Sequence, residues 1–138
     1  MEGPKKGCRR RPAEGRQRPR MVLVDTSVWV AHLRKGDIRL KSLLNDGLAV
    51  CHPFIVGELA CGNLKNMAEV LSLLQTLPSA VRAEHEDVLS FIEKYHLMGK
   101  GLGYVDMHLL ASAFLSNIPL WTLNKKLNQT ASLLKKAY

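Results

Sequence analysis

Three acidic side chains stand in positions that could hold a divalent cation. Asp25 directly follows the apolar run MVLV, Glu58 lies within PFIVGELACG, and Asp106 follows the glycine-rich segment GKGLGYV. Each also has an ordinary structural explanation: Asp25 could cap a helix, Glu58 could be an exposed helix residue, and Asp106 could offset a helix dipole. Taken together, separate carboxylates in apolar surroundings offer the oxygen ligands that Mg²⁺ or Mn²⁺ requires.

Zinc and disulfide chemistry are not indicated by the sequence. It contains no HxH, HExxH or paired Cys/His spacing, and the five histidines are expected on the surface or in helix caps. Cys8, Cys51 and Cys61 form no CxxC pair, so free thiols in a reducing compartment are expected. No apolar run is long enough to cross a membrane, and the expected location is the cytoplasm.

The positive charge of the chain is concentrated at its start. The net charge is +8 over 138 residues, and residues 1–20 hold eight of the twenty Lys and Arg side chains but only two acids. With so few apolar residues, this segment is expected to be a disordered basic extension. It could be an RNA-binding arm, an inert extension, or the product of a start assigned upstream of a natural start at Met21. Residues 21–138 carry little net charge and form the folded domain.

The rest of the sequence alternates apolar strands with amphipathic helices. Strands are expected at residues 21–24, 48–51 and 119–122, with a fourth at 79–81. Helices are expected at residues 26–33, 38–46, 53–61, 65–77, 84–98 and 104–116 and from 124 onward. This order predicts an α/β fold, a three-layer α/β/α sandwich around a mainly parallel sheet. Asp25 and Asn124 then lie just past carboxyl ends of strands, where functional side chains gather in such sheets. The chain stops soon after its last helix, which leaves open whether a final edge strand exists.

Four segments together resemble the motifs of PIN-domain ribonucleases, and most of all the VapC-type toxins of type II toxin–antitoxin systems. They are VLVDTSVWV, the Glu of PFIVGEL, GLGYVDMHLLASA and LWTLNKKL. The resemblance runs from about residue 21 to residue 134. It implies a Mg²⁺- or Mn²⁺-dependent endoribonuclease that cleaves tRNA or rRNA to inhibit translation. It also implies a cognate antitoxin protein as partner and a homodimer.

The resemblance assigns roles residue by residue. Asp25, Glu58 and Asp106 fall on the first three acidic positions of the family. The fourth, often Asp, is Asn124 here, which leaves a site of three negative charges and makes a second cation harder to hold. The resemblance implies Asp25 and Asp106 as direct metal ligands, with Glu58 joining them or positioning the attacking water.

Neighbouring polar residues complete the expected site. The hydroxyls of Ser27 and Thr122 would orient the carboxylates from behind. Lys100, Lys125 and Lys126 would bind the RNA backbone, although solvated surface lysines are the ordinary alternative.

Two other functions are compatible with parts of the pattern. With Asn124 in the fourth position, the domain could be a catalytically weak or inactive module that binds RNA or protein. A phosphatase of the haloacid-dehalogenase type also places Asp after its first strand, but it needs a second Asp where Ser27 stands.

Apolar residues on the early helices have two alternative explanations. Trp29, Leu33, Leu43 and Leu44 could line an antitoxin groove or a dimer face, or belong to the core. For Trp29 and Trp121, core packing is favoured over base stacking because their neighbours are apolar.

Overall fold

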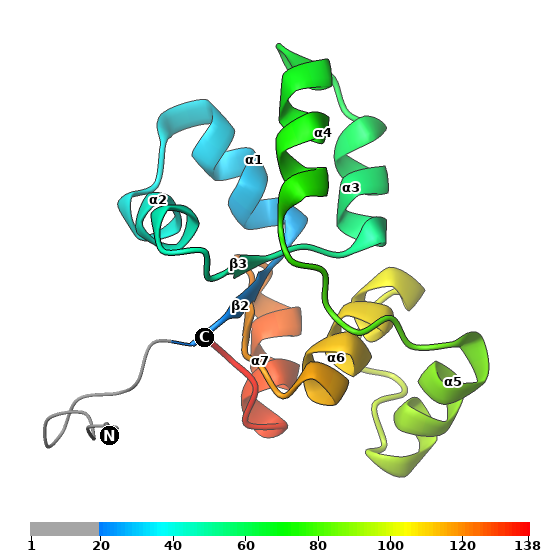
Figure 1. The fold of residues 1–138 in the computed structure, drawn as a ribbon. Helices are drawn as coiled ribbons and strands as arrows, with labels where there is room; N and C mark the ends of the chain where they lie inside the picture. Colours follow the sequence, from blue (N-terminus) through cyan, green and yellow to red (C-terminus); the bar gives the residue numbers. More distant parts are fainter. Residues whose placement is uncertain (1–19) are drawn as a thin grey trace, which may run out of the picture.

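A short parallel sheet lies at the centre of the computed structural model, which describes residues 20–138 (Figure 1). Its strands are β2 (Val22–Val24), β3 (Ala49–Val50) and β4 (Leu120–Trp121), in the order β3-β2-β4. Both outer strands run parallel to β2. The expected disordered extension and Cys8 lie outside the described residues, except for Arg20.

Seven helices cover the sheet and its flanks in the described part of the chain. They are α1 (Thr26–Lys35), α2 (Ile38–Asn45), α3 (Pro53–Ala60), α4 (Met67–Thr76), α5 (His85–Lys94), α6 (Tyr104–Ser116) and α7 (Lys125–Leu133). Helices α1 to α4 lie on one side of the strands and α5 to α7 on the other (Figure 1). The expected three-layer α/β/α arrangement is confirmed.

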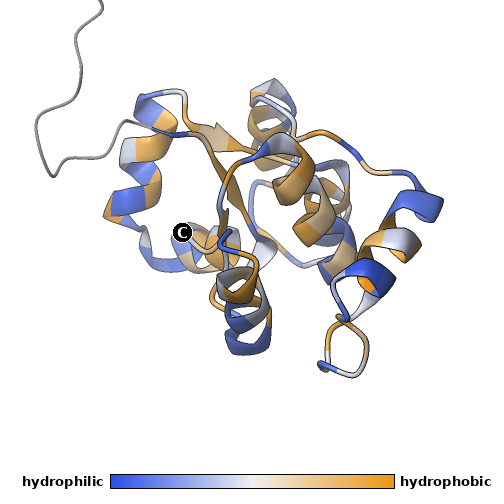
Figure 2. Ribbon diagram, turned by 90° about the horizontal axis from the view of Figure 1, so that it is seen from below, coloured by the Kyte–Doolittle hydropathy of each residue, from blue (hydrophilic) through white to orange (hydrophobic). Residues whose placement is uncertain are grey.

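The core forms where β2 and α6 cross the middle of the molecule. Every residue of β2 is buried, and so are the seven consecutive residues Met107 to Ala113 of α6. A strand covered on both faces must be apolar throughout, which is why VLV reads as one continuous run. Figure 2 shows hydrophobic residues along the central strands, and both hydrophilic and hydrophobic residues on the outer helices. Trp29 and Trp121 belong to this core, at 1% and 4% exposure.

Two expected edge features are shorter than a full strand. The segment expected as a strand at 79–81 contributes one parallel bridge, between Ser79 and Cys51. At the other edge the chain end does pair with β4, through a parallel bridge between Ala137 and Leu120. These single bridges extend a sheet whose outer strands, β3 and β4, are themselves only two residues long.

Among residues 20–138, no helix has the length and apolar character needed to cross a bilayer. Cys51 is buried and Cys61 is exposed, and both are free thiols.

Candidate active site

Asp25 occupies the residue before α1 but does not cap that helix. Its side chain accepts no hydrogen bond from the backbone of α1. Asp37, in the same position before α2, behaves as a usual cap and accepts from the backbone nitrogens of Arg39 and Leu40. Helix capping therefore does not explain the position of the Asp25 carboxylate. This side chain is only 7% exposed.

Two hydroxyl groups hold the Asp25 carboxylate from one side. Thr122 Oγ1 donates to Oδ2 at 2.7 Å and Ser27 Oγ donates to the same oxygen at 2.9 Å. The backbone nitrogens of Leu123 and Asn124 donate in turn to Ser27 Oγ and Thr122 Oγ1. Among the described residues no donor reaches Oδ1, so one carboxylate oxygen is fixed and the other is left for a ligand.

Glu58 lies beside the start of α1, although it comes from α3. Thr26 Oγ1 donates to Glu58 Oε1 at 2.6 Å, which brings Glu58 next to the residue that follows Asp25. Glu58 is exposed, which agrees with the ordinary helix position that its sequence context left open. In this helix of eight residues only Ile55 and Leu59 turn fully inward, which leaves Glu58 on the solvent face.

Asp106 stands in the first turn of α6. Its Oδ2 accepts from the backbone nitrogen of Gly103 at 3.1 Å, so this carboxylate does serve the helix start. The preceding glycine loop touches the beginning of α7: a Cβ on Gly101 would lie 2.9 Å from Lys126 Nζ. Asp106 is thus connected through this loop to the segment that follows β4.

Asn124 acts as the N-terminal cap of α7. Its Oδ1 accepts from the backbone nitrogen of Leu127 at 3.0 Å. One lone pair of the oxygen expected to complete a metal site is therefore engaged in the cap, and the Nδ2 donor remains. Lys100, Lys125 and Lys126 are all exposed.

The structure does not bring the three acids into a single cluster. Within residues 20–138, no group of three or more His, Cys, Asp or Glu side chains lies close enough to hold one metal ion. Each carboxylate instead has its own local donor: two hydroxyls for Asp25, Thr26 for Glu58 and a backbone N–H for Asp106. Carboxylate oxygens are the ligand type that suits Mg²⁺ or Mn²⁺, so the chemistry of these side chains fits such an ion, while their positions in this structure form no shared site.

Two buried histidines lie between α3 and α6. His52 has the capping position expected for it, whereas the expectation fails for His108, which is buried within α6. His52 does cap α3, with Nδ1 accepting from the Phe54 nitrogen, but it is only 1% exposed and its Nε2 contacts Ser112 Oγ. Burial, with His108 and Arg82 nearby, lowers the pKa of His52 from 6.5 to about 4. Burial also lowers the pKa of His108, with further contributions from His85 and Arg82, and its Nδ1 has no partner among the described residues.

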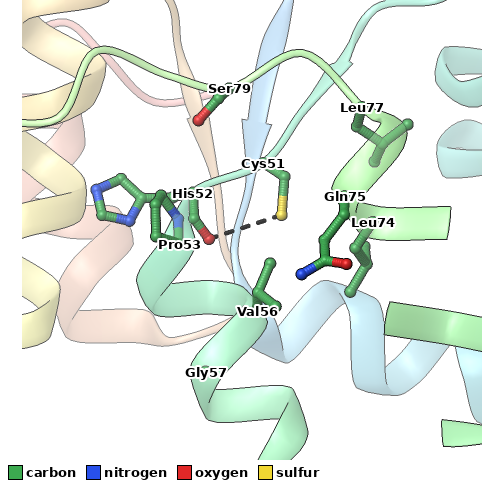
Figure 3. Close-up of a pocket in the computed structure, with 9 residues that line it drawn as sticks. All are labelled: Cys51, His52, Pro53, Val56, Gly57, Leu74, Gln75, Leu77 and Ser79. Atoms are coloured by element: carbon green, nitrogen blue, oxygen red, sulfur yellow. Dashed lines mark hydrogen bonds between the residues drawn. The ribbon is translucent and has the colours of Figure 1, made fainter. Parts of the chain in front are cut away.

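A cavity beside His52 lies away from the acids. It has a volume of about 450 Å³ and is enclosed by α3, α4 and the segment after α4. Figure 3 shows the Cys51 thiol and the Gln75 amide at this space, with Val56 opposite. None of Asp25, Glu58 and Asp106 lines it. Burial raises the pKa of the Cys51 thiol, which therefore stays protonated and unreactive at neutral pH.

Comparison with known proteins identifies the family. The PIN domain profile matches residues 22–133, which is most of the chain. The chain belongs to the PIN-domain family. This PIN domain is 46% identical over 108 residues to Ribonuclease VapC32 of Mycobacterium tuberculosis in two strains, covering 78% of this chain and 87% of the relative.

More distant relatives cover a similar part of the PIN domain. Ribonuclease VapC1 of Methanocaldococcus jannaschii is 28% identical over 109 residues, covering 76% of each chain. The crystal structure of PAE2754 from Pyrobaculum aerophilum matches with a TM-score of 0.54 at 16% identity, covering 80% of this chain and 78% of that one. The structural match supports the fold.

The buried His52 makes the stability of the PIN domain sensitive to acid. Between pH 6.5 and about 4 the unfolded chain binds a proton at His52 that the folded chain does not, so stability falls as the pH drops through this range. The loss reaches up to about 3 kcal/mol. Urea unfolding at a series of pH values measures it.

The control is His52→Asn, which keeps a capping acceptor but does not titrate in this range. Its stability should change less between pH 6.5 and 4 than that of the unsubstituted protein. Equal pH dependence of the two proteins would show that His52 is not responsible.

Proposed function

We propose that this PIN domain is a divalent-metal-dependent endoribonuclease. The observation that carries the proposal is the Asp25 carboxylate, buried at the carboxyl end of β2 and held by hydroxyls through one oxygen only. A carboxylate that caps no helix and pairs with no cation among the described residues is available to a metal ion. Membership of the PIN family and 46% identity to a ribonuclease of the VapC type support the same reaction.

Asp25 and Asp106 are proposed as the direct ligands of Mg²⁺ or Mn²⁺, with Glu58 completing the set. The hydrogen bond between Thr26 and Glu58 is exposed, so breaking it costs only about 1 kcal/mol. Asp106 would exchange its Gly103 N–H for the ion in the same way. When bound, the ion supplies positive charge at the scissile phosphate and makes a water molecule more acidic.

Side chains of the protein would then position the attacking water and accept its proton. Glu58 is the best-placed general base because its side chain is solvent-exposed and held only by Thr26. Ser27 and Thr122 keep the Asp25 carboxylate in one orientation throughout. Asn124 would contribute its Nδ2 group as a donor to the phosphate, since its Oδ1 caps α7.

Lysines on either side of the acids would bind the RNA backbone. Lys126 is the best placed because its side chain lies against Gly101, in the loop that leads to Asp106. Lys125 directly precedes Lys126 at the start of α7, and Lys100 directly precedes Gly101 in the glycine loop. Both side chains are exposed. Their positive charges would attract phosphates without reading the base sequence.

The biological role we propose is that of a toxin in a toxin–antitoxin pair. The VapC-type resemblance points to tRNA or rRNA as substrate, to inhibition of translation as the result, and to the cytoplasm as the location. A homodimer is proposed on the same resemblance. A chain that binds RNA without cleaving it is the alternative, and the capping role of the Asn124 oxygen favours it.

An antitoxin segment is proposed to bind in a groove between α1 and the α3–α4 connection. Two earlier candidates are excluded, because Trp29 and Leu43 belong to the core at 1% and 8% exposure. The groove has a volume of about 750 Å³. Its lining includes Val30, Leu33, Leu64 and Val70 together with the cations Arg34 and Lys65. This lining suits an apolar segment that also carries acidic side chains.

Asp25→Asn should lower metal-dependent cleavage of tRNA and rRNA by about a hundredfold or more, because it removes a charged metal ligand. The measurement is the cleavage rate of purified RNA in Mg²⁺ or Mn²⁺, with EDTA as the zero point. The matched control is Glu93→Gln, an exposed acid on α5, which should cleave at the original rate. Full activity of Asp25→Asn would remove Asp25 from the mechanism, and inactivity of the unsubstituted chain would favour the binding alternative.

Leu33→Asp should weaken binding of the antitoxin encoded beside this chain by at least about tenfold, because it puts an acid into the apolar groove. Co-purification and titration of the co-expressed pair measure the effect. Leu133→Asp, at a 71% exposed position on α7, is the control and should bind normally. Equal binding of the two variants would place the antitoxin elsewhere.

A further inference from the structure

Four aromatic side chains form a continuous row from α3 to the surface of α6 and α5. The row consists of Phe54, His108, Tyr104 and His85. The ring centroids of Phe54 and His108 are 4.6 Å apart, those of His108 and Tyr104 are 4.7 Å apart, and those of Tyr104 and His85 are 5.6 Å apart. The proposed cleavage chemistry uses none of these rings.

The aromatic row lies on the same two helices as two of the acids. Phe54 and Glu58 are four residues apart in α3, so they share one face of that helix. Tyr104 begins α6, two residues before Asp106. Phe54 thus lies one helical turn from Glu58, and Tyr104 lies in the same first turn of α6 as Asp106.

The outer end of the aromatic row is both exposed and fixed in orientation. Tyr104 is 45% exposed, although its ring packs edge-on against the buried His108 at an interplanar angle of 87°. Its hydroxyl is hydrogen-bonded to His85 Nδ1. A large aromatic surface that is already held in place loses little conformational freedom when a ligand stacks on it.

The charges around this corner favour a neutral ligand group. Glu84, Glu86 and Asp87 surround His85 at the start of α5, and all three are exposed. They would repel a phosphate that approached the corner. An uncharged aromatic group, such as a nucleobase, would meet no such repulsion.

We propose that the exposed ring of Tyr104 stacks on an unpaired nucleobase of the RNA substrate. The proposal rests on the ribonuclease function proposed above and adds that the RNA is single-stranded where it crosses α6. The bases of an RNA duplex are stacked on each other and cannot offer a free face, whereas bases in loops can be splayed onto aromatic side chains. Lys126 and its neighbours then hold the backbone while Tyr104 holds a base.

The test is binding of a short single-stranded RNA that carries the fluorescent base 2-aminopurine. The full chain with Asp25→Asn serves as background, so that the probe stays intact in Mg²⁺. Stacking should quench the fluorescence on binding. Adding Tyr104→Ala should weaken binding about tenfold and remove the quenching, and Tyr104→Leu should also remove the quenching. Tyr104→Phe should retain both.

The matched control is Tyr138→Ala, which removes a tyrosine of similar exposure, 49%, that packs on Trp121 instead. This variant should bind and quench as the background does, and the same probe in a duplex should not be quenched. Equal behaviour of Tyr104→Ala and Tyr138→Ala, or equal quenching by single strand and duplex, would overturn the proposal. Because this assay reads binding alone, its failure would leave the cleavage assay untouched, and a chain that does not cleave would still give a result here.

Discussion

The hydrogen bonds that Thr122 and Ser27 donate to Asp25 join the carboxyl ends of two neighbouring strands. Thr122 follows β4 and Asp25 follows β2, so this contact links residues 97 positions apart. The backbone nitrogens of Leu123 and Asn124 complete the same small network. Buried polar groups need partners, and this network provides them while turning one carboxylate oxygen away from the protein donors. This network fixes the orientation of the Asp25 carboxylate.

Each of the three acids has hydrogen-bond donors of its own. Carboxylates brought together without a cation would repel each other, and an opposite charge or hydrogen-bond donors must compensate. Here a hydroxyl from Thr26 holds Glu58 and a backbone N–H holds Asp106. These are weak, local interactions that a divalent ion can replace.

The sequence predicted the elements better than the contacts between them. The continuous run VLV identified β2 and thus the position of Asp25, because only a strand buried on both faces is apolar throughout. The sequence could not show that Asp37 caps its helix while Asp25 does not, because both precede a helix. The hydroxyls of Ser27 and Thr122 that hold Asp25 make the difference. The sequence left open whether Glu58 is exposed, because apolar neighbours in a short helix do not fix which face turns inward.

The aromatic row depends on tertiary structure in the same way. Phe54, His108 and His85 come from three helices, and no spacing in the sequence brings them together. Tyr104 could have been noticed from its place between the glycines and Asp106. Its exposure and its contacts with two histidines could not.

The central claim is that Asp25, Glu58 and Asp106 share one divalent ion. A crystal structure of the protein with Mn²⁺, read through the anomalous scattering of the metal, tests it most directly. We expect one strong peak coordinated by carboxylate oxygens of both Asp25 and Asp106, with Glu58 released from Thr26 and turned toward the ion. A Mn²⁺ peak elsewhere, with each acid still on its own hydrogen-bond donor, would contradict it.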